Sequence, residues 1–296
     1  MKISILGSNG FLSTALARFA NEKGWALDVH GRREPEGYRC DNFFKIDFAE
    51  TKVDSRMLLD SDIVIYAVGA GIQANLKESA ELIHKLNVEV PKDICRQLDE
   101  LDFEGRFVTF GSVFEMGETT ERHSFTEEDI LNSTCPAPNA YTVSKREFSR
   151  FVSSETYGFT HWHFIIPTIY GTGENPKRLI PYTVGAIRQN APLHFTAGDQ
   201  TRQYLHVSEV PKIIEKAFER KLSGGIYNIE GCETLTVKGI VTKIHTLLGK
   251  DVPTDCFGSV ERADVGMKHL ALDGSKLRKA IGFKASVRIE DVIDTY

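Results

Sequence analysis

The sequence predicts an α/β fold in which a parallel β-sheet is covered by helices on both faces. Short apolar runs alternate with amphipathic stretches of ten or more residues, an alternation typical of right-handed βαβ units. Glycines stand at the first strand–helix junction. The 296 residues are 41% hydrophobic and 26% charged, which suits one full domain and a smaller second one.

The expected strands are short, nearly unbroken apolar runs, and the expected helices have apolar residues every three or four positions. The strands are Lys2–Leu6, Ala26–His30, Ile63–Val68, Phe107–Phe110, His163–Ile166 and Gly225–Ile229. The helices are Leu12–Lys23, about Gln73 to Leu101, Tyr141–Thr156 and Ser208–Arg220. After Pro167 the pattern loosens, and a loop-rich stretch is expected. It is punctuated by Gly171, Gly173, Pro176, Pro181 and Pro192. A small mixed region should follow from about residue 230.

Composition narrows the function classes. The net charge is -5 and no long basic run occurs, which argues against nucleic acid as a partner. No apolar run reaches the roughly 20 residues of a membrane-spanning helix, and the N-terminus lacks the pattern of a secretory signal. The five cysteines are scattered without a CxxC pair. Free thiols in a reducing cytoplasm, with no metal site, are therefore expected.

The first strand runs directly into Gly7-Ser8-Asn9-Gly10-Phe11-Leu12-Ser13 and then into a helix. Glycines at such a turn let backbone N–H groups approach a pyrophosphate at the positive end of the helix. The junction therefore predicts a dinucleotide-binding loop. The alternative is a tight turn without a ligand.

The end of the second strand bears on cofactor choice. It reads Val29-His30-Gly31-Arg32-Arg33, with no acidic residue to accept a hydrogen bond from the ribose 2′-hydroxyl of NAD. Two adjacent arginines can instead pair with a 2′-phosphate, so NADP(H) is favoured over NAD(H). The alternative is a pair of solvated arginines, neutralised by Glu34 and Glu36.

Three residues form a candidate catalytic group. Tyr141 and Lys145 are four residues apart at the start of a helix, which places both on one face. An ammonium and a cationic nicotinamide ring would stabilise the phenolate, so that Tyr141 becomes an acid or base near neutral pH. Ser112 follows an apolar strand, at the edge where parallel strands face a ligand. A YxxxK pair alone is usually only a helix face.

Taken in this order, these motifs resemble the extended branch of the short-chain dehydrogenase/reductases, the nucleotide-sugar epimerase/dehydratase/reductase group. The resemblance covers nearly the whole chain. It implies a Rossmann-like doubly wound parallel sheet with a smaller mixed C-terminal substrate domain. Residues 1–167 plus about 205–229 would form the dinucleotide-binding domain, and about 168–204 plus 230–296 the substrate domain.

The resemblance also implies site residues. Asp47 resembles an adenine-contacting aspartate, Ala67-Val68-Gly69 the loop under the nicotinamide ribose, and Asn87 a helix asparagine that supports the lysine. The implied cofactor contacts are Gly7, Asn9, Gly10, Phe11, Leu12, Arg32, Arg33, Asp47, Phe48, Ala67, Val68, Gly69, Asn87, Tyr141, Lys145, Pro167 and Ile169. The implied substrate contacts are Ser112, Val113, Thr168, Asn175, Arg178, Leu179, Phe195, Arg202, Arg262 and Asp264.

Among the substrate contacts, Arg202 and Arg262 resemble diphosphate-binding arginines, a role that suits the guanidinium fork. Asp264 would accept from a ribose hydroxyl, and Phe195 would stack on a base. Surface charge or loop packing is the alternative for each.

Departures from the family pattern narrow the reaction. Ser13 stands in place of a third glycine. Sugar 4,6-dehydratases resembling this chain carry an acid pair where Val113 and Phe114 stand, and an apolar pair cannot deliver the proton that dehydration needs. The cysteine of the epimerase-reductases related to fucose synthesis is also absent after the serine motif. Dehydration and 3,5-epimerisation are therefore not expected.

The leading hypothesis is NADP(H)-dependent reduction of a 4-keto nucleotide-linked (6-deoxy)sugar, as in the bacterial 4-ketoreductases that the chain resembles. One alternative is a C4 epimerase, and another is a non-catalytic NADP-binding sensor or scaffold. The helical stretches at 73–101 and 141–156 resemble the pair that forms a four-helix dimer interface in the family. A homodimer is therefore expected.

Overall fold

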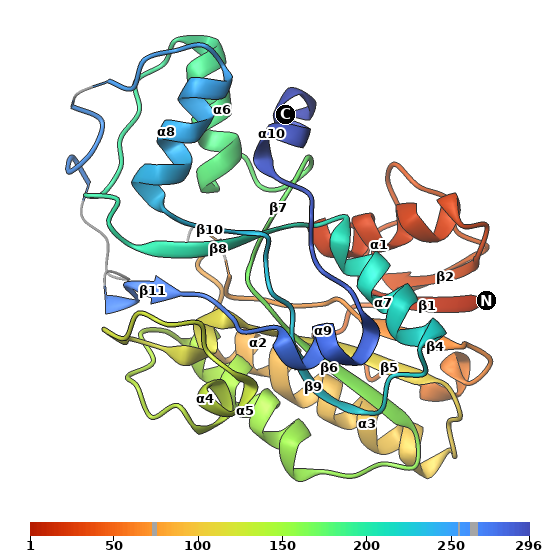
Figure 1. The fold of residues 1–296 in the computed structure, drawn as a ribbon. Coiled ribbons are helices and arrows are strands. Elements are labelled where there is room, and N and C mark those ends of the chain that lie inside the picture. The colour runs from red at the N-terminus through yellow and green to blue at the C-terminus, as the bar shows by residue number, and fades with distance from the viewer. Residues whose placement is uncertain (73–75, 254, 261–265) are drawn as a thin grey trace.

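The computed structural model describes residues 1–72, 76–253, 255–260 and 266–296. Its largest feature is a seven-stranded sheet in the order β3-β2-β1-β4-β5-β6-β9, in which every neighbouring pair is parallel (Figure 1). The strands are β1 (Lys2–Leu6), β2 (Ala26–Gly31), β3 (Asn42–Lys45), β4 (Ile63–Tyr66), β5 (Arg106–Ser112), β6 (Thr160–Ile166) and β9 (Gly225–Asn228). The predicted doubly wound parallel sheet is confirmed.

Helices cover both faces of this sheet because strand side chains alternate between them. On one face, Ile3 and Ile5 of β1 pack in one buried cluster with residues of α1 (Phe11–Glu22), α7 (Glu209–Glu219) and α9 (Ser275–Ile281). On the other face, Leu6 lies in the cluster that α3 (Val90–Glu100) supplies. The neighbouring cluster includes residues of α4 (Glu127–Asn132) and α5 (Ala140–Ser154).

A second, mixed sheet lies below the helices α6 and α8 at the top of Figure 1. Its central strand β8 (Thr201–His206) pairs antiparallel with β10 (Glu233–Thr236) and parallel with both β7 (Thr168–Tyr170) and β11 (His269–Leu270). A separate buried core lies here, built partly from α6 (Leu179–Gln189), α8 (Val237–Leu247) and α10 (Ile289–Val292). The smaller mixed region expected from the sequence is therefore present.

The exact division into a dinucleotide domain and a substrate domain stays a prediction. The segment allotted to the substrate domain includes α9, and its residues Leu277 and Ile281 pack in the core of the large sheet. The last residues of the chain return to the smaller core, where Ile289 and Ile293 are buried. Short 3₁₀ turns complete the fold at Ser55–Leu58, Val113–Met116 and Ile293–Thr295.

The helix expected from about Gln73 to Leu101 is shorter and interrupted. Residues 73–75 lie outside the described residues, Lys77 has a φ of 50°, and α2 (Ala80–His84) begins after Ser79, whose side chain accepts from Leu82 N–H. A π-helical turn, Lys85–Glu89, then leads into α3. Pro91 explains the wide turn, since it has no N–H to donate four residues back.

The loop-rich stretch expected after Pro167 in fact contains β7, α6 and β8. Pro181 is the third residue of α6, where a missing N–H costs nothing because the first four helical N–H groups have no partner within the helix. The expectation of a loop was wrong here because proline breaks only the interior of a helix.

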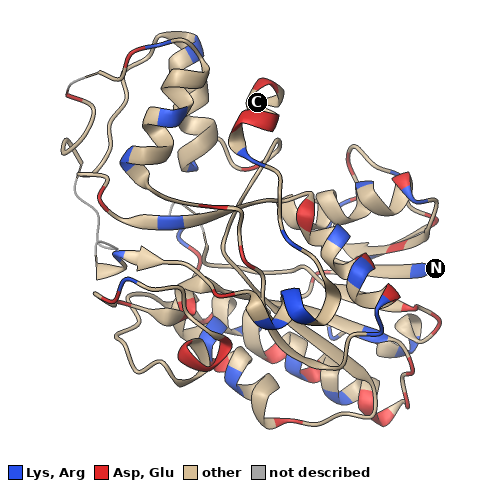
Figure 2. Ribbon diagram, viewed as in Figure 1, with Lys and Arg blue, Asp and Glu red and all other residues tan. Residues whose placement is uncertain are grey.

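No helix among the described residues combines the length and apolarity that crossing a bilayer requires. Lysine and arginine are interspersed with aspartate and glutamate over the helices that flank the large sheet (Figure 2), in keeping with the small net charge of -5.

Candidate active site

The glycine loop after β1 lies against the loop after β4. Gly7 has a φ of +114°, and a Cβ there would stand 3.3 Å from both the carbonyl carbon and the oxygen of Ala67. Val68 lies beside it, with its Cγ2 3.5 Å from the same point. Only glycine combines this dihedral with so close an approach. The fold therefore brings together two loops that the sequence predicts to bind one dinucleotide.

The N-terminus of α1 lacks a capping side chain. Gly10 is its N-cap, and no acidic residue occurs in the first turn, so the positive end of the helix remains suited to an anion. Ser13, which replaces a glycine of the family pattern, is fully buried, and its hydroxyl donates to Gly10 O at 3.0 Å. The serine therefore fits without disturbing the turn.

Asn9 links the glycine loop to the segment after β2 by hydrogen bonds. Its side chain donates to Glu34 O at 2.8 Å and accepts from Glu36 N–H at 2.9 Å, so its amide holds protein backbone. Arg32 and Arg33 are exposed. Within the described part of the chain neither guanidinium forms a hydrogen bond or an ion pair, so neutralisation by nearby glutamates is not what the structure shows.

The remaining predicted cofactor residues are mainly held by local contacts. Asp47 accepts from Ala49 N–H at 2.9 Å. Phe48 is buried and packs edge-on against Tyr66. Of the others, Phe11, Leu12, Ala67, Val68 and Ile169 are partly buried, while Gly69 is exposed.

Asn87 does not hydrogen-bond to the lysine that it was expected to support. Its Nδ2 donates to Ser144 Oγ at 2.9 Å and to Ala70 O at 3.0 Å, and its Oδ1 accepts from Ala70 N–H at 3.1 Å. Asn87 therefore ties the loop at Ala70 to Ser144, the residue of α5 that precedes Lys145.

Ser112, Tyr141 and Lys145 converge at the carboxyl end of β5. Ser112 is the last residue of that strand and is buried. Helix α5 begins after Asn139, whose side chain accepts from Thr142 N–H at 2.9 Å, and this cap sets Tyr141 in the first turn. The Ser112 hydroxyl acts on the phenol of Tyr141 and lowers its pKa. Lys145 Nζ donates to Phe110 O at 2.8 Å.

Removal from water dominates the electrostatics of this group. It raises the pKa of Tyr141 to about 12, against the lowering effect of the Ser112 hydroxyl. Desolvation also lowers the pKa of Lys145 to about 8, because its ammonium points inward to a carbonyl although part of the residue remains exposed. The charges that act on Tyr141 are those of Glu115, which raises its pKa, and Arg178, which lowers it. The lowering expected from the Lys145 ammonium is not found among the described groups, and the phenol is protonated at neutral pH.

A cavity of about 530 Å³ opens beside this group, within the size range of small-molecule sites. It gathers predicted substrate residues from separate segments of the chain: Thr168, Asn175, Arg178, Leu179, Phe195 and Arg202. Its wall also contains Phe114, whose ring lies edge-on to Tyr141 with 6.5 Å between centroids. Phe114 thus connects the cavity to the catalytic group.

Four predicted substrate residues are not among the described residues of this cavity wall, and the first is Ser112, which is buried at the end of β5. Val113 is fully buried in a core cluster and is absent from the cavity wall, because the turn after β5 directs it inward. Arg262 and Asp264 lie outside the described residues.

The two arginines of the cavity wall are held in place. Arg202 is only 8% exposed, its Nη1 donates to Thr201 O and Met267 O, both at 2.8 Å, and its guanidinium lies 5.9 Å from the Phe114 ring centroid. Arg178 donates to Ile169 O at 3.1 Å. The reading of Arg202 as a surface charge is therefore wrong, since buried hydrogen bonds fix its orientation.

Sequence reasoning missed two buried carboxyl groups. Glu174 lines the cavity, its Oε2 lies 3.2 Å from Arg178 Nε, and burial raises its pKa to about 7. Glu115 lies under Ser112, and its Oε1 accepts from Ser112 N–H at 2.7 Å. The spacing Ser112-x-x-Glu115 is that of a capping box and was a usable signal. The four-residue spacing of Glu174 and Arg178 was a weaker one.

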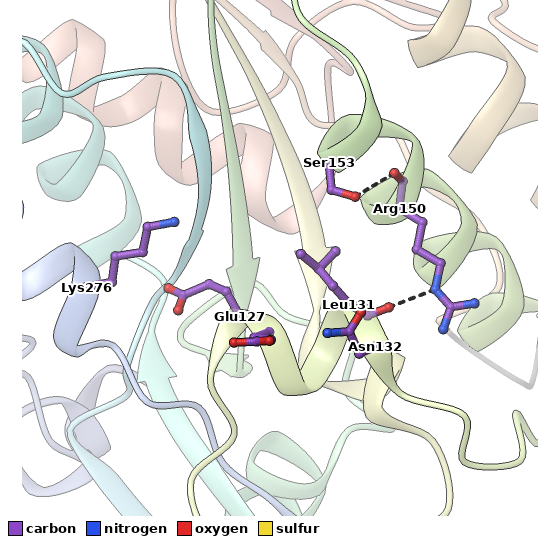
Figure 3. Close-up of a pocket in the computed structure, with 7 residues that line it drawn as sticks. Glu127, Leu131, Asn132, Arg150, Ser153 and Lys276 are labelled. Atoms are coloured by element: carbon purple, nitrogen blue, oxygen red, sulfur yellow. Dashed lines mark hydrogen bonds between the residues drawn. The ribbon is translucent and has the colours of Figure 1, made fainter.

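A second depression, shown in Figure 3, contains none of the predicted site residues. Arg150 on its wall donates to Leu131 O at 2.9 Å, and Lys276 donates to Ile226 O at 2.7 Å. Its full lining is Glu127, Glu128, Leu131, Asn132, Arg150, Ser153 and Lys276. With its basic groups engaged by backbone carbonyls, it does not compete with the site beside Tyr141.

Comparison with known proteins supports the same family. Residues 3–229 match the model of the NAD dependent epimerase/dehydratase family. A dTDP-glucose 4,6-dehydratase of Streptomyces griseus is 26% identical over 281 residues, spanning 93% of this chain and 75% of the relative. Another, from Escherichia coli K12, is 27% identical over 195 residues, spanning 60% of this chain and 51% of the relative.

Solved structures share the fold. A dTDP-glucose 4,6-dehydratase double mutant from Streptomyces venezuelae, solved with NAD bound, superposes with a TM-score of 0.82 at 20% identity, covering 99% of this chain and 94% of that one. A UDP-glucose 4-epimerase from Thermotoga maritima, solved with UDP-glucose, gives 0.80 at 16% identity, with 98% and 96% covered. Because the family model spans most of the chain, this protein belongs to the NAD dependent epimerase/dehydratase family.

Proposed function

We propose that this protein reduces a 4-keto nucleotide-linked (6-deoxy)sugar with NADP(H), using Ser112, Tyr141 and Lys145. The observation that carries the proposal is the convergence of Ser112, Tyr141 and Lys145 at the carboxyl end of β5, beside a cavity that holds two fixed arginines. That arrangement provides a proton donor at one end and cations suited to a diphosphate at the other.

The dinucleotide is expected to bind across the Gly7 loop and the uncapped end of α1. The close approach of Gly7 to Ala67 supports this placement, since any side chain there would fill the cradle. When bound, the nicotinamide dinucleotide supplies the hydride. Arg32 and Arg33 favour NADP(H) because two unpaired guanidinium groups suit a 2′-phosphate. NAD(H) is the alternative, since related structures were solved with NAD.

Residues of the protein itself supply the proton for this reaction. As hydride reaches the ketone carbon, negative charge develops on the carbonyl oxygen. Tyr141 is protonated at neutral pH and donates its proton to that oxygen. The Ser112 hydroxyl hydrogen-bonds to the same oxygen and orients it, while Lys145 binds the cofactor ribose. The phenolate left behind is stabilised by the positive charge of Arg178, which already lowers the pKa of Tyr141, until it is reprotonated.

The substrate is expected to lie in the cavity with its diphosphate near Arg178 and Arg202. Phe195 is buried and already stacks on Phe257, with 5.5 Å between centroids, which leaves base stacking to its remaining face. Relatives solved with UDP-glucose support a sugar nucleotide as the ligand class. Arg262 and Asp264 remain proposed contacts.

Dehydration is not proposed, although the matched curated relatives are dehydratases. Eliminating water needs an acid and a base beside the serine, and this chain has Val113 and Phe114 there. Val113 is buried in the core and Phe114 presents an aromatic ring to the cavity. Neither side chain can transfer a proton.

The test is incubation of the purified protein with NADPH and a panel of dTDP-, CDP-, GDP- and UDP-linked 4-keto sugars. Loss of NADPH absorbance together with a 4-hydroxy product identified by NMR is the expected result. Loss of water from a nucleotide glucose with NAD⁺ would instead show a dehydratase and overturn the proposal.

A C4 epimerase is the second candidate, favoured by the shared fold with a UDP-glucose 4-epimerase. It would convert UDP-glucose to its C4 epimer with no net consumption of cofactor, which the same NMR assay detects. A non-catalytic sensor or scaffold would bind NADPH and leave every sugar unchanged. The presence of both Tyr141 and Lys145 argues for catalysis.

A further inference from the structure

Glu115 is a fully buried carboxyl group immediately beneath the proposed catalytic serine. It is the third residue of the 3₁₀ turn Val113–Met116. Its Oε1 accepts from Ser112 N–H at 2.7 Å, and the Ser112 hydroxyl accepts from Phe114 N–H at 3.3 Å. The carboxyl group therefore fixes the backbone from which Ser112 projects.

The surroundings of Glu115 are shaped around its carboxyl group. A Cβ on Gly111 would stand 2.6 Å from Glu115 Oε1 and 2.8 Å from His163 Nε2. Any residue other than glycine would therefore displace the carboxyl group or the ring. The Oε2 atom is buried and has no hydrogen-bond partner among the described residues. A carboxyl group held this way is costly unless charge nearby compensates it.

Two positively charged side chains of α5, Arg146 and Lys145, act on Glu115. Arg146 Nε donates to the backbone carbonyl of Glu115 at 2.8 Å, and its other nitrogens donate to Cys135 O and Met116 O at 3.0 and 3.1 Å. The guanidinium is thus committed to backbone oxygens. Lys145 is the second cation, and its ammonium is held inward by Phe110 O at 2.8 Å.

We propose that Glu115 is the counter-ion of Lys145 and the positioning residue for Ser112, a fourth member of the group at the end of β5. This rests on the proposed function, in which Ser112, Tyr141 and Lys145 form the site. The carboxylate accepts from Ser112 N–H and the ammonium donates to Phe110 O, so backbone groups on either side of Gly111 hold the two charges close together. They form no direct ion pair among the described contacts, and their interaction is Coulombic between buried groups, where charges are weakly screened.

The groups that face Glu115 and Lys145 set the pKa values of both side chains. Burial raises the pKa of Glu115, while the Ser149 hydroxyl, Ser112 N–H, Lys145 and Arg146 oppose that rise. The negative charge in turn raises the pKa of Lys145 against desolvation and contributes to the raised pKa of Tyr141. From β6, His163 is neutral because burial lowers its pKa.

Substitutions can distinguish a purely structural role of Glu115 from its role as the counter-ion of Lys145. Glutamine at position 115 retains an oxygen that accepts from Ser112 N–H but carries no charge. Asp129 offers a matched control, because it closes the capping box of Thr126 in the same way, accepting from Thr126 N–H at 2.9 Å. It lies on α4, outside the wall of the proposed cavity. Asp129→Asn therefore removes a capping carboxylate without touching the site.

The experiment measures the pKa of Lys145 directly. Trace acetic anhydride labels free amines, and mass spectrometry of the peptide containing Lys145 follows labelling across the neutral and alkaline range. The unaltered protein should show a midpoint near pH 8. In Glu115→Gln the midpoint should fall by about half a unit to one unit, because an opposite charge is lost. Asp129→Asn should match the unaltered protein.

Equal midpoints in Glu115→Gln and the unaltered protein, or a rise in the variant, would overturn the proposal. If Glu115→Gln does not fold, Ser149→Ala is the second test of the proposal. Loss of the Ser149 hydroxyl raises the pKa of Glu115, so the labelling midpoint of Lys145 should fall by a smaller step. An unchanged midpoint there counts against the counter-ion. Labelling needs no substrate, so failure of every keto sugar to react would refute the proposed function without affecting this result.

Discussion

At the residue scale, the state of Tyr141 depends on its dry surroundings. Burial raises its pKa to about 12, so the side chain is a proton donor in the direction of ketone reduction. The Ser112 hydroxyl and the positive charge of Arg178 oppose this rise. The tyrosine therefore holds its proton until charge develops on the substrate oxygen.

Replacing Tyr141 tests this role. General acid catalysis is typically worth about 10²–10⁴-fold, so Tyr141→Phe should lower single-turnover reduction by roughly that factor while leaving NADPH affinity nearly intact. Lys145→Ala should impair both turnover and NADPH binding. Ser112→Ala should lose less than Tyr141→Phe, because the phenol still donates to the same oxygen. Reduction by Tyr141→Phe at the unaltered rate would refute the mechanism.

The exposed pair Arg32 and Arg33 should decide cofactor preference. Because neither side chain pairs with a described residue, both are available to a 2′-phosphate, and NADPH should bind more tightly than NADH. Changing both to alanine should remove most of that difference in calorimetric titration. Arg39→Ala, an exposed arginine on the same loop, should leave it unchanged. Equal affinities in the unaltered protein would contradict the prediction.

At the element scale, a buried polar row ties β5, β6 and α5 together behind the catalytic group. Thr109 Oγ1 hydrogen-bonds with His161 Nε2 at 2.8 Å and with His163 Nδ1 at 2.7 Å. His163 Nε2 in turn hydrogen-bonds with Ser149 Oγ at 2.8 Å. All four residues are buried. The row fixes the register of α5 on the sheet, and with it the position of Lys145.

These histidines predict a loss of stability in mild acid. Burial lowers the pKa of His161 from an ordinary 6.5 to about 3, and it also lowers the pKa of His163 well below 6.5. The unfolded chain therefore binds protons below pH 6.5 that the folded chain does not. The free energy of unfolding should fall by roughly 1.4 kcal/mol per pH unit for each histidine.

Urea titrations at a series of pH values measure this slope. His161→Gln retains a hydrogen-bonding group for Thr109 but does not titrate, so its slope below pH 6.5 should be shallower by roughly 1.4 kcal/mol per pH unit. His123→Gln, at an exposed position, should match the unaltered protein. Identical slopes in all three proteins would rule out the buried neutral histidines as the cause.

At the scale of the whole molecule, α2 and α5 lie side by side on one face of the large sheet. Glu147 joins them, with its carboxylate 3.0 Å from His84 Nε2 and 2.8 Å from Lys92 Nζ. Val143 is 50% exposed on α5, two residues from Tyr141 and so on nearly the opposite side of the helix. An exposed valine there suits contact with a second copy.

A homodimer through this face is predicted. Light scattering at micromolar concentration should give twice the monomer mass of 33.2 kDa. Val143→Lys should shift the protein toward the monomer, because a charge would be buried at the centre of the contact. Leu247→Lys, at a comparably apolar exposed position on α8, should remain a dimer. A monomer mass for the unaltered protein would refute the prediction.

Local pattern was enough for the large sheet and for the core of the proposed site. Apolar runs located six of the seven strands, the glycine loop follows the first strand as predicted, and Tyr141 and Lys145 lie at the start of a helix as predicted. These features depend on neighbours within a few residues, which is why the sequence alone determined them. The edge strand β3 was not predicted from the sequence, because Asn42–Lys45 is short and half-exposed.

Only the tertiary structure decided what surrounds the catalytic group. Arg178 and Arg202 meet Phe114 in one cavity although they come from distant segments, and α6 packs against the smaller core. The burial of Glu115 beneath Ser112 likewise follows from how α5 closes over β5. Desolvation and long-range packing set these properties, and neither has a periodic signature in the sequence.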